Sequence, residues 1–218
     1  MATRAWNLRY SLLKLKHAVS EAVASPHQGS VADVLQTTVE AYQRRLTQVI
    51  ALAGVSMAPT LNPLGTKDPG AVEQLLVRRI PRPSTSNVWV GDVVALKTPS
   101  SLQPISLANT EHVDYMVRRV AAMPGEELVT DDPEDEPVVL QQGQCWVLAD
   151  NEELQPPAVL DSRTFGPLDL SSIIGRVLYA ARSPSDHGPV ENSTAAMQAD
   201  VAVLEAELDI DKLCKQEQ

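Results

Sequence analysis

The chain has 218 residues, of which 44% are hydrophobic, and its formal net charge is −10. This length and composition predict one globular core with extensions. The negative charge excludes a general nucleic-acid-binding protein, because phosphate binding needs clustered Lys and Arg.

Residues 1–45 are expected to form two helices. From residue 3 to residue 24, apolar side chains recur at spacings of three and four, and four Lys and Arg side chains precede the first acid, Glu21. This pattern predicts an amphipathic helix. The helix is either retained and docked on a partner or a membrane surface, or it is a cleaved mitochondrial or plastid targeting segment. A second helix is predicted after Ser30, and no apolar run reaches the roughly 18 residues that a transmembrane helix needs.

Residues 46–182 change to short β-type runs separated by Pro, Gly and Asp. The runs predicted as strands are 48–53, 74–80, 88–97, 115–122, 127–130, 137–140, 144–149 and 173–181. Short runs with frequent turns are typical of a compact domain that is mainly β, antiparallel and barrel-like.

Residues 183–218 are expected to form a linker followed by an acidic helix. The linker is Ser-Pro-Ser-Asp-His-Gly-Pro at 183–189, and the helical spacing extends from Ala195 to Cys214. This helix either docks on a partner or folds back on its own domain.

A serine stretch, Gly-Val-Ser-Met-Ala-Pro-Thr-Leu at 54–61, follows an apolar run. Three more segments come after it in a fixed order, at 91–97, 117–125 and 145–151, the last being followed by Asp-Ser-Arg-Thr-Phe-Gly-Pro at 161–167. Together the segments resemble the conserved boxes of type I signal peptidases. The resemblance is closest to the mitochondrial inner membrane peptidase branch of that serine–lysine protease family, and it extends to a divergent plant and algal signal-peptidase-like group.

The resemblance implies that Ser56 stands at the position of the nucleophile and that the family's lysine base falls on Arg118. A neutral lysine can take the serine proton, because burial disfavours its charged form. Arginine stays charged and has no free lone pair to offer. The resemblance also implies structural positions around the site, at Met57, Pro59, Thr60, Asp150, Asn151, Asp161 and Arg163.

Three other side chains come into question as the base. Lys97 is a candidate for a displaced base, although a surface lysine is the ordinary interpretation; Lys67 lies in a predicted loop, and His112 reads as a solvated loop histidine. The small hydroxyl residue that positions the lysine in the family is Val159 here. Its loss is expected if no lysine needs positioning.

Two hypotheses follow for the function. The first is a signal-peptidase-like protein of an organelle that is catalytically impaired and acts as a structural or peptide-binding subunit of a larger complex. The alternative is an active serine endopeptidase that processes organellar targeting sequences through Ser56. Either is expected at the mitochondrial inner membrane as a peripheral protein, with the plastid as the alternative. The partners expected are peptides or complex subunits. No metal or other cofactor is expected, and Cys145 and Cys214 have no metal-ligand spacing.

Overall fold

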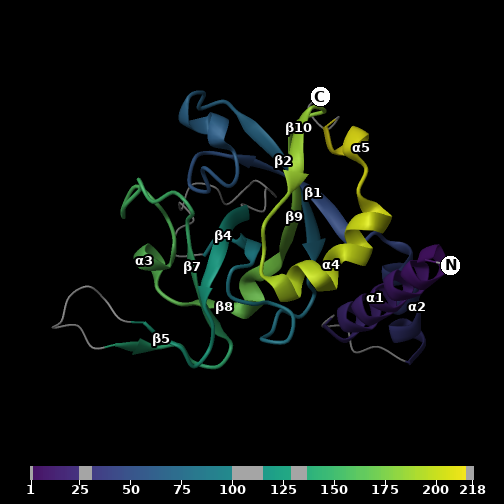
Figure 1. Ribbon diagram of the computed structural model, residues 1–218. Helices are drawn as coiled ribbons and strands as arrows, with labels where there is room; N and C mark the ends of the chain where they lie inside the picture. The colour runs from purple at the N-terminus through teal and green to yellow at the C-terminus, as the bar shows by residue number, and fades with distance from the viewer. Residues whose placement is uncertain (1, 25–30, 100–114, 129–136, 215–218) are drawn as a thin grey trace.

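The computed structural model describes residues 2–24, 31–99, 115–128 and 137–214, and the side chains from residue 8 onward (Figure 1). Most of the chain between the terminal helices is β structure. The strands are β1 (Thr47–Ala53), β2 (Val72–Arg79), β3 (Val93–Lys97), β4 (Tyr115–Ala122), β5 (Glu127–Leu128), β6 (Val138–Val139), β7 (Gln144–Leu148), β8 (Leu168–Asp169), β9 (Ile173–Ser183) and β10 (Asp186–Pro189).

The main sheet has eight strands, seven of them in the order β1-β2-β9-β3-β4-β7-β8, with β10 paired to β9. Every pairing in it is antiparallel. The strands β5 and β6 form a separate two-stranded ribbon. The prediction of a mainly β, antiparallel fold with helices at both ends is therefore confirmed.

Helices stand at the two ends of the chain. They are α1 (Ala2–Ala24) and α2 (Val31–Gln43) before the sheet, the one-turn α3 (Ser162–Phe165) within it, and α4 (Thr194–Glu207) and α5 (Ile210–Cys214) after it. Among the described residues, none of the helices has the length and hydropathy to cross a membrane.

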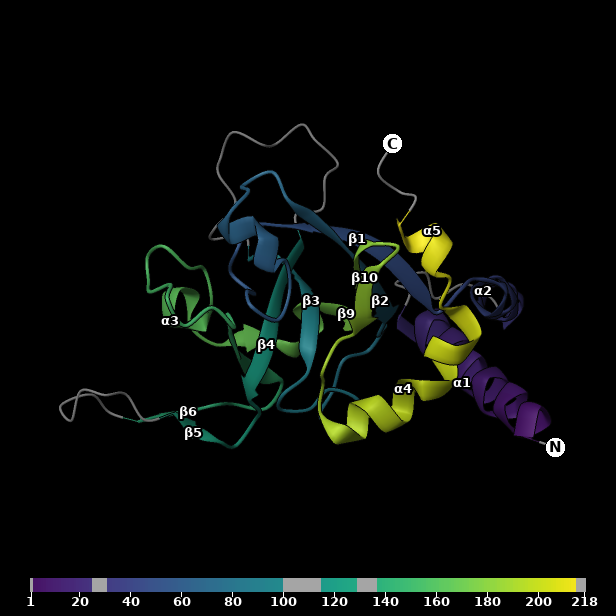
Figure 2. The same cartoon turned by 45° about the horizontal axis from the view of Figure 1, so that its top comes forward.

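The two ends of the sheet are brought together at the loop that follows β1. Met57 and Leu61 in this loop are almost fully buried, and they pack in one core cluster with Val93 of β3 and Val117 of β4. The loop is also hydrogen-bonded to Asn151, which follows β7. The curved sheet thus places the end of β1 beside the β3–β4–β7 end (Figure 2).

Residues 183–189, expected to be a linker, instead complete a hairpin. β9 runs on to Ser183, and β10 pairs with it from Asp186 to Pro189. The segment contains Gly188 and Pro189 and has no apolar alternation, so its own sequence does not predict a strand. It is a strand because the long neighbouring strand β9 offers an edge with which it pairs. β8 was also missed, because its two residues are too few to show a period.

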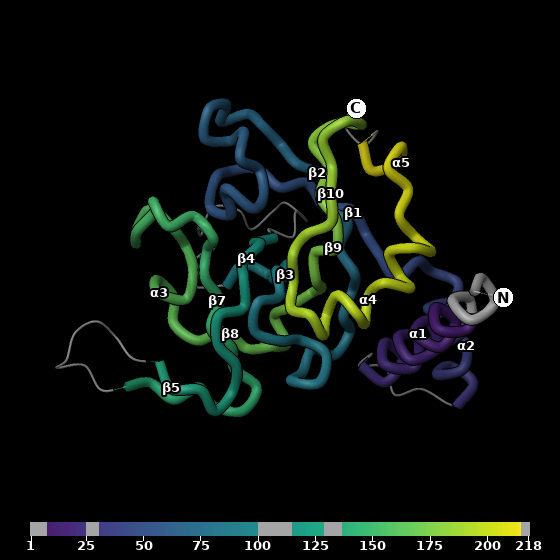
Figure 3. The backbone as a smooth tube through the Cα atoms, viewed as in Figure 1, coloured from purple at the N-terminus to yellow at the C-terminus, as the bar shows by residue number. Residues whose placement is uncertain are grey.

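The C-terminal helix α4 folds back on the β domain and lies beside both the sheet and α1 (Figure 3). An ionic cluster holds it there. The Arg176 guanidinium on β9 is 1% exposed, and it donates to Asp92 at 2.6 Å and to Asp200 of α4 at 2.8 Å. Arg78 of β2 pairs with the same Asp200 carboxylate. Ser193 caps the helix and also donates to Asp92. Of the two alternatives for this helix, the structure shows the folded-back one.

A second buried carboxylate, that of Glu207, holds α1 against the β domain. It is 3% exposed and accepts hydrogen bonds from the Tyr10 hydroxyl, from the backbone amides of Leu46 and Thr47, and from the Thr47 hydroxyl. Burial alone would raise the pKa of Glu207, but these hydrogen bonds outweigh it and hold the pKa below its ordinary value. One side chain at the end of α4 therefore connects α1 with the start of β1.

Candidate active site

The loop that carries Ser56 leaves β1 through Gly54, whose φ of 85° is a left-handed conformation that favours glycine. The loop then closes on itself, with the Ala58 amide donating to the Val55 carbonyl at 3.1 Å. Met57 is 1% exposed and anchors the loop in the core. Ser56 itself is partly exposed, and the Pro59 and Thr60 positions that follow are exposed. The loop is thus anchored in the core by Met57 while Ser56 stays partly accessible to solvent.

Two asparagines hold the backbone at the serine and at the two residues before it. The Asn151 side chain donates to the Val55 carbonyl at 2.9 Å, and its backbone amide donates to the Ser56 carbonyl at 3.0 Å. Asn62 is 1% exposed, and its side chain donates to the carbonyls of Gly54 and Ala71, both at 2.9 Å. Asn62 was not among the predicted site residues. The Asn-Pro pair at 62–63 marks a turn, which is the signal that was available.

Arg119 and Asp150 form a forked ion pair next to this loop. Two nitrogens of Arg119 donate to the two carboxylate oxygens of Asp150, at 2.9 and 2.6 Å, and a third donates to the Gly91 carbonyl at 2.7 Å. The pair fixes the segment that ends in Asn151, and so it supports the serine loop from one residue away.

Asp161 and Arg163 fix the next loop. The Asp161 carboxylate is fully buried, caps α3 through the Arg163 amide, and accepts from the Ala149 amide at 3.1 Å and from the Arg163 guanidinium at 2.7 Å. Burial would raise the pKa of Asp161, but these donors outweigh it and lower the pKa. The result is a rigid connection between the 158–166 loop and the end of β7.

Arg118 lies on β4 opposite Val94 and is 5% exposed. Its Nε donates to the Leu160 carbonyl at 2.9 Å, and its Nη1 donates to the Val117 carbonyl. Burial lowers the pKa of Arg118 to about 10, against the opposing charges of Asp161 and Asp150.

The structure thus brings Arg118 together with the loop of Asp161, and Asn151 together with the backbone of Ser56. No hydrogen bond joins the Ser56 hydroxyl to another group within the residues that the structure describes. The residue predicted for the position of the base, Arg118, is thus a donor-only guanidinium whose Nε and Nη1 are directed at carbonyls.

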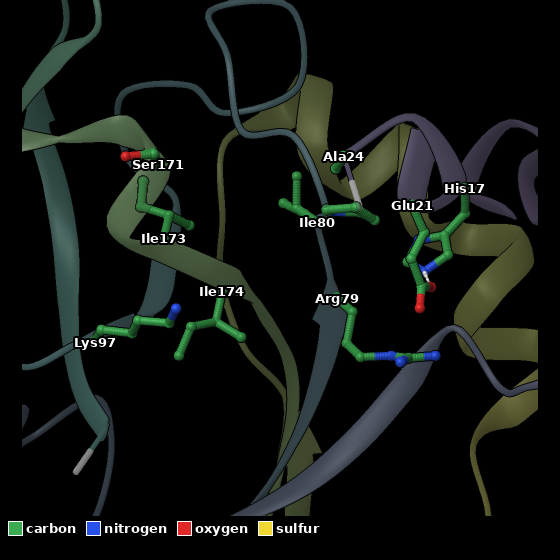
Figure 4. Close-up of a pocket in the computed structure, with 10 residues that line it drawn as sticks. His17, Glu21, Ala24, Arg79, Ile80, Lys97, Ser171, Ile173 and Ile174 are labelled. Carbon is green, nitrogen blue, oxygen red and sulfur yellow. Dashed lines mark ion pairs between the residues drawn. The ribbon is translucent and has the colours of Figure 1, made fainter. Parts of the chain in front are cut away.

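The displaced-base candidates lie elsewhere or cannot be placed. Lys97 ends β3, three residues and so about 10 Å along the strand from Val94, the residue paired with Arg118. It lines a cavity of about 400 Å³ with His17, Glu21 and Arg79, between α1 and the sheet (Figure 4). Lys67 follows the 3₁₀ turn Pro63–Thr66 and is exposed. His112 is outside the described residues.

The cavity in Figure 4 contains none of the residues predicted for the serine site. Its polar side chains come from α1 and β2 on one side, and from β3 and the 3₁₀ turn Leu170–Ser172 on the other. In the described part of the chain, no group of three or more His, Cys, Asp or Glu side chains is placed to hold a metal ion. The candidate active site therefore consists of the serine loop, the segment of Asp150 and Asn151, and the 158–166 loop that contacts Arg118.

These features define a mainly antiparallel β fold with a hydrogen-bonded serine loop and a buried arginine, Arg118. No family model matches the chain. The chain is 35% identical to the mitochondrial ATP-independent inner membrane protease subunit 2 of Arabidopsis thaliana, over 99% of this chain and 98% of the relative. It is 27% identical to the mitochondrial inner membrane protease subunit 2 of Saccharomyces cerevisiae, over 66% of this chain and 72% of the relative. It is 29% identical to the mitochondrial inner membrane protease subunit 2 of Danio rerio, over 68% of this chain and 72% of the relative. The chain belongs to the mitochondrial inner membrane protease subunit family, which is signal peptidase I-like.

Proposed function

We propose that this chain is a catalytically impaired subunit of a mitochondrial inner membrane protease-like complex, one that binds extended peptide or a partner segment without cleaving it. All three relatives are named as proteins of the mitochondrial inner membrane, and this favours the mitochondrion over the plastid as the location. The same names describe protease subunits, which supports membership of a complex.

The state of Arg118 is the observation that carries the proposal. Serine attack on a peptide carbonyl requires a group that removes the hydroxyl proton at working pH. Arg118 occupies the position of that group as a cation, and its hydrogen bonds to the Leu160 and Val117 carbonyls are of the kind that favour the charged form. Val159 precedes Leu160, whose carbonyl accepts from Arg118; it is 1% exposed and has no hydroxyl.

Peptide binding is supported by the position of β1. β1 ends the strand order of the main sheet, so one of its edges is free of strand pairing within the described residues, and it leads directly into the loop of Ser56. An extended peptide could add to this edge through main-chain hydrogen bonds alone. Such binding needs neither a nucleophile nor a base.

The test is cleavage of a fluorogenic presequence peptide by the purified full chain and its variants. The wild type is expected to match Ser56→Ala, with no cleavage above that background. The double variant Arg118→Lys/Val159→Ser restores both the amine and the hydroxyl, and it is expected to raise Ser56-dependent cleavage about 100-fold or more, the lower range for general base catalysis. Arg119→Lys is the matched control, because it changes the neighbouring arginine without supplying a base at position 118.

Binding is measured separately, by fluorescence anisotropy of the uncleaved peptide. Wild type and Ser56→Ala are expected to bind equally, whereas Ala51→Pro on β1 is expected to bind more weakly, since proline blocks edge pairing. Absence of peptide binding would remove the peptide-binding half of the proposal. Robust wild-type cleavage that Ser56→Ala abolishes would overturn the impaired-enzyme half.

An active serine endopeptidase is the second candidate function. Its support is the serine loop, which is held by Asn151 and Asn62 as a working site requires, and the protease names of the relatives. The cleavage assay separates the two candidates directly, because only an active enzyme loses activity on Ser56→Ala.

A further inference from the structure

α1 has two faces with different surroundings. One face is buried: Ala18 is 0% and Ala22 is 7% exposed, and His17 and Glu21 line the cavity against the sheet in Figure 4. The Glu21 carboxylate also pairs with Arg44 at 3.0 Å. Together with the Tyr10–Glu207 hydrogen bond, these contacts fix how the helix is rotated on the domain.

The other face of α1 is apolar and exposed. Its side chains recur at spacings of four, three, four and four, which places them on one side of a helix. They form the α1 stripe: Leu8 (63% exposed), Leu12 (57%), Leu15 (48%), Val19 (46%) and Val23 (57%). A stripe of five large aliphatic side chains on a helix is more than the scattered exposure of a soluble surface, and it marks an interaction site.

Basic side chains border the α1 stripe. Arg9 and Lys16 line a hollow of about 310 Å³ with Leu12, between α1 and Ala199 of α4. The α1 sequence holds four Lys and Arg residues and a single acid, Glu21, in a chain of net charge −10. Two of these residues, Arg9 and Lys16, border the apolar stripe, whereas Lys14 lies over the Tyr10 and Tyr42 rings.

α2 also exposes apolar side chains, including Val31 and Leu35, but it has Asp33 and Glu40 and no Lys or Arg within its bounds. An anionic surface would attract α1 and repel α2. The charge pattern consequently selects α1 as the contacting helix.

We propose that the α1 stripe lies in the interface of an anionic lipid bilayer, with Arg9 and Lys16 at the level of the lipid phosphates. An amphipathic helix binds such a surface by burying its apolar face and by attraction between basic side chains and anionic headgroups. The proposal deepens the proposed inner membrane location and is independent of whether the chain binds or cleaves peptide. It assigns an attachment surface in a chain whose described helices are unable to span a membrane.

The test is co-sedimentation of the full chain with vesicles of phosphatidylcholine and cardiolipin and with vesicles of phosphatidylcholine alone. Binding is expected for the cardiolipin vesicles, with a decrease as salt is raised, because salt screens the headgroup attraction. Equal binding to both kinds of vesicle would overturn the role of Arg9 and Lys16. No binding to cardiolipin vesicles would overturn the proposal itself.

Leu12→Glu removes a central member of the α1 stripe and is expected to lower binding to cardiolipin vesicles about tenfold or more. Val139→Glu is the matched control, because Val139 on β6 is also 57% exposed and lies outside the helices, and its binding is expected to equal that of the wild type. Far-ultraviolet circular dichroism confirms that both variants fold. Unchanged vesicle binding by Leu12→Glu would refute the assignment, and so would self-association without vesicle binding, since it would assign the stripe to a second copy of the chain.

Discussion

Replacing Asp200 with alanine should undock α4 from the sheet. The Asp200 carboxylate is 6% exposed and pairs with both Arg176 and Arg78, two guanidinium groups that are 1% and 16% exposed. Without it, Arg176 keeps Asp92 as its carboxylate partner and Arg78 keeps none among the described ion pairs. The variant therefore leaves excess positive charge in a dehydrated position.

The magnitude follows from that burial. Breaking a buried ion pair by removing one partner costs about 3–5 kcal/mol, because the remaining charge is left uncompensated. For a chain of this size each kcal/mol lowers the Tm by about 2–4 °C. The expected decrease in Tm for Asp200→Ala is thus on the order of 10 °C.

The assay is thermal unfolding followed by circular dichroism, with Asp186→Ala as the control. Asp186 pairs with Arg182 at 2.7 Å on the surface, where its side chain is 52% exposed, and loss of an exposed pair is expected to change the Tm little. Hydrogen exchange should in addition show faster exchange along α4 in Asp200→Ala. A Tm equal to that of the wild type would show that the ionic cluster does not hold the helix.

Three further predictions concern single side chains. Burial, together with the nearby Arg79 charge, lowers the pKa of His17 to about 4 from its ordinary 6.5. The unfolded chain therefore takes up this proton at a higher pH than the folded chain does, so the free energy of unfolding falls by up to roughly 3 kcal/mol as the pH is lowered from 6.5 toward 4. Denaturant unfolding at those two pH values should show a smaller decrease for His17→Leu than for the wild type. Asn151→Ala removes the hydrogen bond to the Val55 carbonyl and should cost about 1–2 kcal/mol, with faster proteolysis at the serine loop as the second readout. Gly175→Ala would place a Cβ 2.1 Å from the Arg78 carbonyl oxygen and should prevent folding, as judged by circular dichroism, whereas Gly70→Ala should be tolerated.

The strands were predictable where local pattern and local structure agree. β4 extends from Tyr115 to Ala122 as the sequence predicts, since its residues are strand-forming and a Pro-Gly turn follows. The final helix was predicted as continuous from Ala195 to Cys214, but it breaks between α4 and α5, where the Asp209 side chain accepts from the Lys212 amide. Turn-forming side chains of this kind compete with helix propagation, and a prediction from the spacing of apolar residues takes no account of them.

The sequence predicts which residues make up the candidate site, but it does not predict their contacts. The sequence alone shows arginine at position 118. That its guanidinium donates to the Leu160 carbonyl depends on a loop 42 residues away, and such a pairing leaves no local pattern. The same holds for Arg176, which interrupts an apolar strand and is explained only by carboxylates 84 and 24 residues distant. Long-range polar partners are decided by packing, which periodicity does not report.

The position of Glu207 in the chain sets an order on folding. This carboxylate accepts the hydrogen bond from Tyr10 and those from Leu46 and Thr47 at the start of β1, yet it lies about 200 residues after Tyr10. Synthesis proceeds from the N-terminus, so the hydrogen bond between Tyr10 and Glu207 forms only after the end of α4 has been made. The docking of α1 through this carboxylate is therefore a late step of folding, although α1 is the first helix of the sequence to be synthesised.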